Sequence, residues 1–286
     1  MSDLKSIVRH GIKRVAPLLW YIYLKKRRKL GSFEATITLS FDLDYPEDYD
    51  RLPYLLDILE SYNLKGSFAV IGKFIEIYPE LHNKIIENGH EIINHSYSHP
   101  DGYFVRNKYF NKLSKSEIKE EIEKMHNVCK EILEYEPIGF RTPHFGELNS
   151  QKVYEVLEEL GYMYSSSTNL TSTQSYGLPY YPSMKDFRKR GYPHFNIVEL
   201  PLFSCPEHFF SVFDTWHCYR TKAHIKEGEF MNLFIKTIEI AKKYKIYVNL
   251  YFDPRDLNKE FEESLECIDV KVLRSCDVVT KLSINF

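Results

Sequence analysis

Two aspartates that follow an apolar stretch place two carboxylates where they can act together. Ala35–Phe41 is rich in β-forming and apolar residues, which predicts a buried strand. Asp42 and Asp44 come at its C-terminal end, and side chains two positions apart on an extended chain point to the same side. Because two carboxylates repel each other, they need a cation or a shared proton close by. A solvated turn or a helix cap is the simpler explanation of such a pair taken alone.

A histidine cluster further along the chain supplies the missing ligand types for a metal ion. The run Asn94–Pro100 contains His95 and His99. One carboxylate and two imidazoles form a three-ligand set that leaves a coordination position for water, as in catalytic zinc sites. The alternative is a pair of histidines in the core or on the surface. Together with Asp44, the pattern favours metal binding.

Alternating strand and helix patterns must position these residues. Repeated strand-then-helix units imply a parallel sheet with right-handed crossovers, either an α/β barrel or an open doubly wound sheet. The polar clusters Asp42/Asp44, His95/His99, Arg141 and Asp253 each come where a predicted strand ends, as active-site residues of barrels do. The predicted strands are Ala35–Phe41, Lys65–Ile71, Glu91–Asn94, Ile138–Arg141, Met163–Ser167, Ile197–Leu202, Ile246–Phe252 and Val270–Leu273. The predicted helices include Tyr49–Tyr62, Phe74–Asn88 with a break near Tyr78, a helix capped by Ser114 or Ser116, one opened by Asn149 or Ser150, and Glu227–Tyr244.

Composition and charge limit the classes of function. The chain has 286 residues, 43% of them hydrophobic, so it is long enough for a sizeable core. A net charge of -2 gives no general attraction to nucleic acid, and no nucleic-acid partner is expected. The five cysteines are scattered and form no Cys-x-x-Cys pair, which favours reduced structural thiols over disulfides or a thiolate zinc site. We therefore expect a cytoplasmic protein.

Residues 1–30 differ from the rest and are predicted to form a basic and apolar N-terminal extension, followed by a catalytic domain over residues 31–286. The apolar run Val15–Leu24 has ten residues, whereas a spanning helix needs about 20. Five cations follow this run, where a signal peptide would have small residues. The extension can lie on an anionic membrane, which would be the inner face of the cell membrane, or it can pack on the domain. The oligomeric state is not predicted.

Three stretches resemble the motifs of the polysaccharide deacetylase family, the NodB-homology group also called carbohydrate esterase family 4. Ser40–Asp44 (Ser-Phe-Asp-Leu-Asp) resembles the first motif, in the Asp-x-Asp form of one subgroup. Gly89–His99, which begins Gly-His-Glu, resembles the second, and Phe140–Phe145 (Phe-Arg-Thr-Pro-His-Phe) resembles the third. The likeness runs from about Thr36 to Phe286 in the correct order.

This resemblance implies a distorted, seven-stranded (β/α) barrel. It also implies a divalent metal, with zinc as the first choice, that is used to hydrolyse the N-acetyl group of an amino sugar in a cell-surface glycan or its precursor. Matched by position, Asp44, His95 and His99 would bind the metal. Asp42 would be the general base for the water that the metal activates, and Arg141 would orient Asp42 and keep it ionised. The resemblance also implies that Tyr45, through its backbone N–H, Pro143 and His144 would contact the substrate.

One position departs from the family pattern. The family's last motif carries a Leu-x-His histidine that protonates the departing amine, whereas this chain reads Asn249-Leu250-Tyr251-Phe252-Asp253-Pro254. Asp253 can act as an acid if burial or a neighbouring anion raises its pKa. Alternatively, His217 or His224 replaces it, or Asp253 is a turn residue before proline. Two other functions therefore stay open, hydrolysis of a non-sugar C–N bond (a cyclic amide or formamide) and carbohydrate binding with weakened catalysis.

Overall fold

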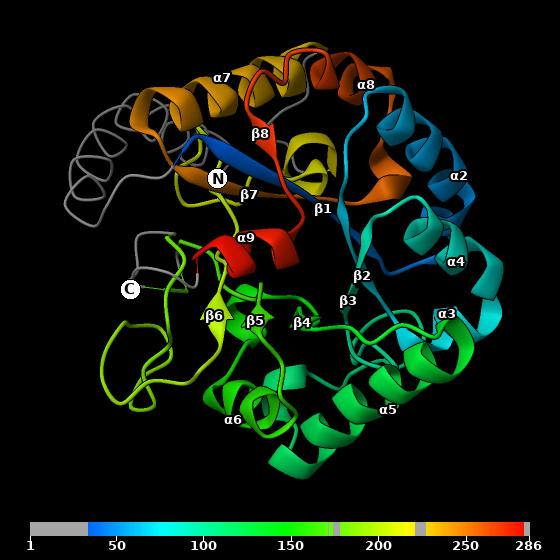
Figure 1. The fold of residues 1–286 in the computed structure, drawn as a ribbon, viewed down its shortest axis with the longest axis vertical. Helices are drawn as coiled ribbons and strands as arrows, with labels where there is room; N and C mark the ends of the chain where they lie inside the picture. Colours follow the sequence, from blue (N-terminus) through cyan, green and yellow to red (C-terminus); the bar gives the residue numbers. More distant parts are fainter. Residues whose placement is uncertain (1–33, 171, 174–177, 221–226, 283–286) are drawn as a thin grey trace, which may run out of the picture.

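The computed structural model describes residues 34–170, 172–173, 178–220 and 227–282, so the predicted N-terminal extension lies outside the described residues. The predicted fold class is confirmed: parallel strands form a strongly curled sheet, and helices surround it (Figure 1). Along the sheet the strand order is β6-β5-β4-β3-β2-β1-β7, and β8 pairs with β1 beside this path. The strands are β1 (Thr36–Leu43), β2 (Ser67–Val70), β3 (Glu91–Asn94), β4 (Gly139–Phe140), β5 (Tyr164–Ser165), β6 (Val198–Glu199), β7 (Tyr247–Phe252) and β8 (Lys271–Val272).

The helices agree with the apolar periodicity of the sequence, with one addition. The break predicted near Tyr78 is confirmed, because two helices meet there and Pro79 begins the second one. A C-terminal helix over Ser275–Leu282 was not predicted. The α-helices are α2 (Pro46–Ser61), α3 (Gly72–Ile77), α4 (Pro79–Glu87), α5 (Lys115–Leu133), α6 (Gln151–Glu159), α7 (Glu229–Tyr244), α8 (Lys259–Leu265) and α9 (Ser275–Leu282).

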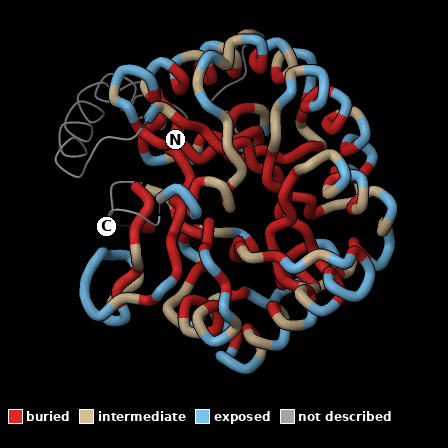
Figure 2. The backbone as a smooth tube through the Cα atoms, viewed as in Figure 1, coloured by how far each residue is buried: buried red, intermediate tan, exposed pale blue. Residues whose placement is uncertain are grey.

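Helix α5 shows how local sequence signals set an element. Ser114 caps its N-terminus by accepting a hydrogen bond from the backbone N–H of Glu117, whose carboxylate accepts one from the Ser114 N–H in return. Its apolar stripe, including Ile118, Ile122 and Met125, is fully buried against the core. Figure 2 shows the same pattern for the whole fold, with buried backbone along the strands and exposed backbone on the outer side of the helices.

Side-chain and loop contacts bring together the two ends of the strand order, β6 and β7. The backbone N–H of Phe203, just after β6, donates to the Asn249 carbonyl on β7 at 2.9 Å. The Asn249 side chain is 2% exposed, and its Nδ2 donates to the Leu200 carbonyl at 2.9 Å and to Ser166 Oγ at 3.0 Å. This buried amide therefore links β7 to the segments that follow β5 and β6.

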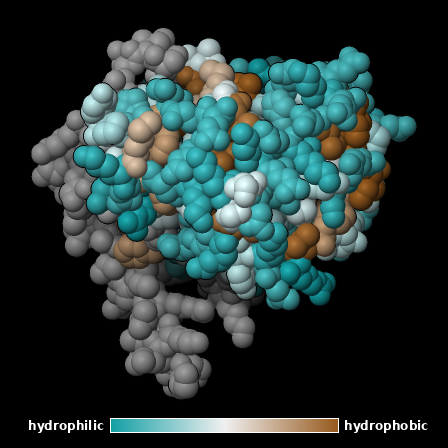
Figure 3. Space-filling model, turned by 90° about the horizontal axis from the view of Figure 1, so that it is seen from below, coloured by the Kyte–Doolittle hydropathy of each residue, from teal (hydrophilic) through white to brown (hydrophobic). Residues whose placement is uncertain are grey.

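The outer surface is largely hydrophilic on the face seen in Figure 3, where apolar side chains are scattered among polar ones. Within the described ranges, no helix combines the length and apolar character that crossing a membrane requires. The predicted contact of residues 1–30 with a membrane stays a prediction.

Replacing Asn249 by alanine should lower the free energy of unfolding by about 1–3 kcal/mol, because two buried hydrogen bonds are lost and their acceptors are left unsatisfied. Urea denaturation followed by circular dichroism measures the change. The control is Asn127→Ala on the exposed side of α5, which should change the free energy of unfolding by less than about 0.5 kcal/mol. Equal effects of the two substitutions would show that Asn249 does not hold the sheet together.

Candidate metal and catalytic site

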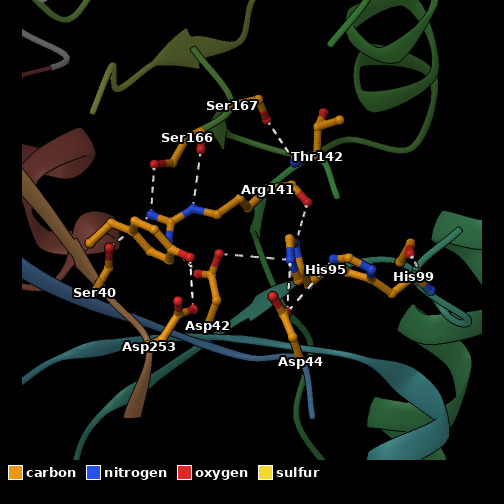
Figure 4. Close-up of polar contacts among 12 residues, drawn as sticks. Ser40, Asp42, Asp44, His95, His99, Arg141, Thr142, Ser166, Ser167 and Asp253 are labelled. Atoms are coloured by element: carbon orange, nitrogen blue, oxygen red, sulfur yellow. Dashed lines mark hydrogen bonds and ion pairs between the residues drawn. The ribbon is translucent and has the colours of Figure 1, made fainter. Parts of the chain in front are cut away.

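Neighbouring parallel strands deliver the predicted site residues to one edge of the sheet. Asp42 lies in β1 and Asp44 follows it, His95 follows β3, Arg141 follows β4 and Asp253 follows β7. Because the strands run parallel, their carboxyl ends lie together, and all five side chains turn toward one site (Figure 4). The prediction that these residues lie where strands end is thus confirmed.

Asp44, His95 and His99 converge in a geometry that suits a metal ion. His95 Nε2 lies 3.3 Å and His99 Nε2 lies 3.7 Å from Asp44 Oδ1. A tetrahedral zinc with bonds of about 2.0–2.2 Å separates such ligand atoms by about 3.4 Å. Within the described part of the chain, none of these three buried atoms has a hydrogen-bond partner. Three orphaned ligand atoms turned toward one point fit a divalent cation, since buried polar groups otherwise find partners.

The backbone around the two histidines fixes which ring atoms face the site. His95 Nδ1 lies 2.8 Å from the Arg141 carbonyl, which leaves Nε2 for the metal. His99 has a left-handed backbone with φ 49°, an uncommon conformation for a residue with a side chain. Its ring lies against Gly102, where an added Cβ would come 2.2 Å from His99 Nδ1. The absence of a side chain at Gly102 therefore makes room for the His99 ring.

Arg141 is fully buried and holds Asp42 in place. Its Nη1 donates to Asp42 Oδ1 at 2.5 Å, and its Nη2 donates to Ser40 Oγ at 2.8 Å and Ser166 Oγ at 2.9 Å. Its Nε donates to the Ser166 carbonyl at 3.2 Å. The second Asp42 oxygen, Oδ2, remains 3.8 Å from His95 Nε2. One Asp42 oxygen is thus tied to the guanidinium, and the other faces the metal ligands.

The electrostatics separate the roles of the two aspartates. Burial raises the pKa of Asp42 above its ordinary value, although Arg141 and His95 lower it. Burial also acts against ionisation of Asp44, but His99 and His95 outweigh it and hold the pKa of Asp44 below its usual range. Burial lowers the pKa of His99 to about 3, so this imidazole is neutral and able to ligate a metal at neutral pH. Asp44 is therefore suited to be a carboxylate ligand, and Asp42 is the group better suited to accept a proton.

Asp253, at the position that departs from the family pattern, lies in the same pocket and is 1% exposed. Its Oδ1 accepts a hydrogen bond from the Tyr251 hydroxyl at 2.7 Å, and its Oδ2 lies 3.2 Å from Arg255 Nη2. Burial raises the pKa of Asp253 well above its ordinary value, and the charges of Asp44 and Asp48 add to this, while Arg255 and Tyr251 oppose it. The environment needed for an aspartic acid to carry a proton is therefore present.

The three predicted substrate contacts are placed differently. Tyr45 and His144 line a pocket of about 460 Å³ with Asp42, Asp44 and Asp253, whereas Pro143 is buried beside it. His144 Nε2 lies 3.1 Å from the Asp101 carbonyl. The backbone N–H of Tyr45, predicted to face an oxyanion, donates to Asp48 Oδ2 at 3.0 Å. This N–H group is therefore already hydrogen-bonded to a side chain at the start of α2.

Sequence reasoning did not find two charged residues that organise this side of the site, Asp48 and Arg255. Asp48 is fully buried, and it accepts hydrogen bonds from the backbone N–H of Asp44 at 3.0 Å and from the Arg255 guanidinium. The Arg255 guanidinium also lies over the Tyr45 ring, 4.5 Å from its centroid. Asp48 lies just before the predicted helix Tyr49–Tyr62, and in the structure it is the third residue of α2, a position where a carboxylate commonly accepts backbone N–H bonds. His224, one alternative acid, lies outside the described residues.

The sequence profile of the polysaccharide deacetylase family matches residues 32–165, which include Asp42, Asp44, His95, His99 and Arg141. Over this range, which is just under half of its length, the chain is similar to the polysaccharide deacetylase family. It is 32% identical over 115 residues to the peptidoglycan-N-acetylglucosamine deacetylase of Bacillus cereus, which covers 40% of this chain and 38% of that protein. It is 41% identical over 68 residues to the Bacillus subtilis peptidoglycan-N-acetylmuramic acid deacetylase PdaA, covering 24% of this chain and 25% of that protein. The matched region thus spans less than half the length of each of these relatives.

Solved structures show the same fold over most of the chain. A structure described as a polysaccharide deacetylase from Mycobacterium smegmatis aligns with a TM-score of 0.68 and 18% identity, covering 87% of this chain and 90% of that one. A pseudoenzyme of carbohydrate esterase family 4 from Bacillus anthracis aligns with a TM-score of 0.52 and 14% identity, covering 87% and 66%. These identities are low, so the likeness demonstrates the polysaccharide deacetylase fold alone.

Replacing Gly102 by alanine should weaken metal binding at Asp44, His95 and His99 by about 10–100-fold, because the added Cβ displaces the His99 ring. Isothermal titration of the metal-free protein with zinc measures the affinity. Gly191→Ala is the matched control, since a Cβ there would meet the Ser183 side chain only at 3.5 Å, an ordinary contact distance. An unchanged affinity in Gly102→Ala would mean that the His99 ring is not a ligand in this position.

Proposed function

We propose that this protein is a metal-dependent deacetylase that hydrolyses the N-acetyl group of an amino sugar in a cell-surface polysaccharide or its precursor. The observation that supports this most directly is the Asp44–His95–His99 ligand set beside an Asp42 that is held by Arg141. The match of residues 32–165 to the polysaccharide deacetylase family and the likeness to the peptidoglycan deacetylases support the same substrate class.

Each residue of the site has a role that follows from its contacts. A divalent metal, zinc in our proposal, would lower the pKa of water and polarise the acetyl carbonyl. Asp42 accepts the proton of the attacking water through Oδ2, because Oδ1 is bound to Arg141. Arg141 keeps the carboxylate aimed at the metal ligands, because its four donated hydrogen bonds fix the guanidinium plane.

Asp253 is proposed as the acid that protonates the departing amine. Its burial keeps a proton on the carboxyl group at a pH where an exposed aspartate is ionised. Tyr251 and Arg255 hold its two oxygens, so the acid has a fixed orientation within the pocket. After it gives its proton to the amine, the new carboxylate is stabilised by the Arg255 guanidinium, which is already in contact with it.

The location of the reaction stays a prediction from sequence. The prediction that the protein is cytoplasmic and acts at the inner face of the membrane has two grounds. They are the scattered cysteines and the composition of residues 1–30, which lie outside the described residues. A substrate at that place would be a glycan precursor.

Acetate release from N-acetylglucosamine oligomers should require the metal site. We expect a chelator to abolish release, zinc to restore it, and His95→Ala to reduce it by more than about 100-fold. The control is His194→Ala, a partly buried histidine outside the pocket, which should keep full activity. Parallel assays for formate release and cyclic-amide opening identify the two non-sugar alternatives. Glycan binding without any release, with metal saturated, would contradict the deacetylase proposal.

Replacing Asp253 by asparagine should reduce kcat by about 10²–10⁴-fold, because the amine then leaves without a proton donor. In the wild-type enzyme the acid works while it is protonated, so kcat should fall as the pH rises through the raised pKa of Asp253. This decrease should be absent from the residual activity of Asp253→Asn. The matched variant Asp253→His supplies the histidine that acts as the acid in the family. It should recover activity, and its kcat should decrease at a different pH from that of the wild type. A pH profile of kcat that is identical in Asp253→Asn and the wild type would eliminate Asp253 as the acid.

A further inference from the structure

A second cluster of metal-binding side chains lies outside the Asp44 site. Cys205, His208 and His217 are buried, and one ligand atom from each lies within 4.8 Å of the other two. The sequence favoured inert thiols, because no Cys-x-x-Cys pair is present. The chain instead contains Cys205-Pro206-Glu207-His208, a Cys-x-x-His spacing, and the tertiary structure adds His217.

We propose that Cys205, His208 and His217 bind a second divalent metal ion, zinc by ligand type, in the wall of the deacetylase pocket. The distances between ligand atoms support a tetrahedral ion. A zinc ion with bonds of about 2.3 Å to sulfur and 2.0–2.1 Å to nitrogen separates a sulfur from a nitrogen by about 3.6 Å and two nitrogens by about 3.3 Å. Cys205 Sγ lies 3.7 Å from His208 Nδ1, and His208 Nδ1 lies 3.3 Å from His217 Nε2.

The loop that carries Cys205 and His208 is shaped to present both side chains on the same side. The Cys205 backbone N–H donates to the Ser211 carbonyl at 2.8 Å, and the Ser211 N–H donates to the His208 carbonyl at 2.7 Å. Burial raises the pKa of the Cys205 thiol to about 12, while hydrogen bonds from the backbone N–H groups of Glu207 and His208 to the sulfur act against this rise. A turn that places two amides on one sulfur is an arrangement suited to a metal-bound cysteine.

The third ligand comes from a separate turn that is also fixed by hydrogen bonds. The backbone N–H of His217 donates to Asp214 Oδ1 at 2.5 Å, and the N–H of Cys218 donates to the Asp214 carbonyl at 3.0 Å. His217 lies within the π-helical turn Trp216–Arg220, a local conformation that frequently occurs at functional sites. The His217 ring meets the His208 ring edge-on, with centroids 5.1 Å apart.

The position of the cluster suggests what the ion would do. Ser211, Asp214 and His217 line the same pocket as Asp42 and Asp253. These residues follow β6 and lie in the yellow part of the chain in Figure 1. An ion bound by Cys205, His208 and His217 would tie the two turns together and hold this wall of the pocket in place. Binding replaces the thiol proton with a metal–sulfur bond and releases one proton to solvent.

Cobalt(II) distinguishes the two sites, because only the proposed one contains sulfur. Metal-free wild-type protein titrated with cobalt should develop the near-ultraviolet absorption of thiolate-to-cobalt charge transfer and bind two equivalents. Cys205→Ala should lose this absorption and one equivalent. The matched control Cys218→Ala removes another buried cysteine of the same region and should keep both. Cys267→Ala should also keep both and excludes cobalt binding at a more accessible thiol.

His99→Ala separates this proposal from the proposed deacetylase function. It should lose acetate release and one equivalent of cobalt but keep the charge-transfer absorption. The absence of that absorption in the wild-type protein would overturn the second site whether or not acetate is released. Its persistence in Cys205→Ala would overturn the site as well. The wild-type spectrum decides the question even if Cys205→Ala does not fold.

Discussion

The site depends on the burial of two carboxylates, Asp42 and Asp44, at the end of one strand. Removing a charge from water is costly unless opposite charges and hydrogen bonds replace the solvent. Here Arg141 binds one oxygen of Asp42, and His95 and His99 surround Asp44. The compensating groups come from the ends of β3 and β4, so the sheet must curl enough for these ends to approach β1. The fold and the charge balance of the site therefore depend on each other.

The same principle explains how an aspartate can stand where the family has a histidine. Burial and the charges of Asp44 and Asp48 raise the pKa of Asp253, and the Arg255 guanidinium is in place to stabilise the carboxylate once the proton leaves. Arg255 also binds Asp48, whose other contacts are backbone N–H groups of the loop after β1. Asp253 is therefore part of a charge network that reaches the metal ligands through the backbone of Asp44.

Likeness to the family and a shared fold do not by themselves establish turnover. The chain shares its fold with a structure described as a pseudoenzyme, and its matches to characterised deacetylases cover less than half of their lengths. Three features of this chain support catalysis. These are the orphaned ligand atoms of Asp44, His95 and His99, the fixed orientation of Asp42, and the burial of Asp253.

The sequence by itself determined the parallel α/β architecture and the set Asp42, Asp44, His95, His99 and Arg141, because strand-helix alternation and short motifs are local patterns. It also located the break at Tyr78, since proline acts on its immediate neighbours. Only the tertiary structure decided that Asp253 is buried, that the Tyr45 amide binds Asp48, and that His217 joins Cys205 and His208. These features depend on contacts between segments distant in sequence or on the direction in which a side chain points, and neither is encoded in the spacing of residues along the chain.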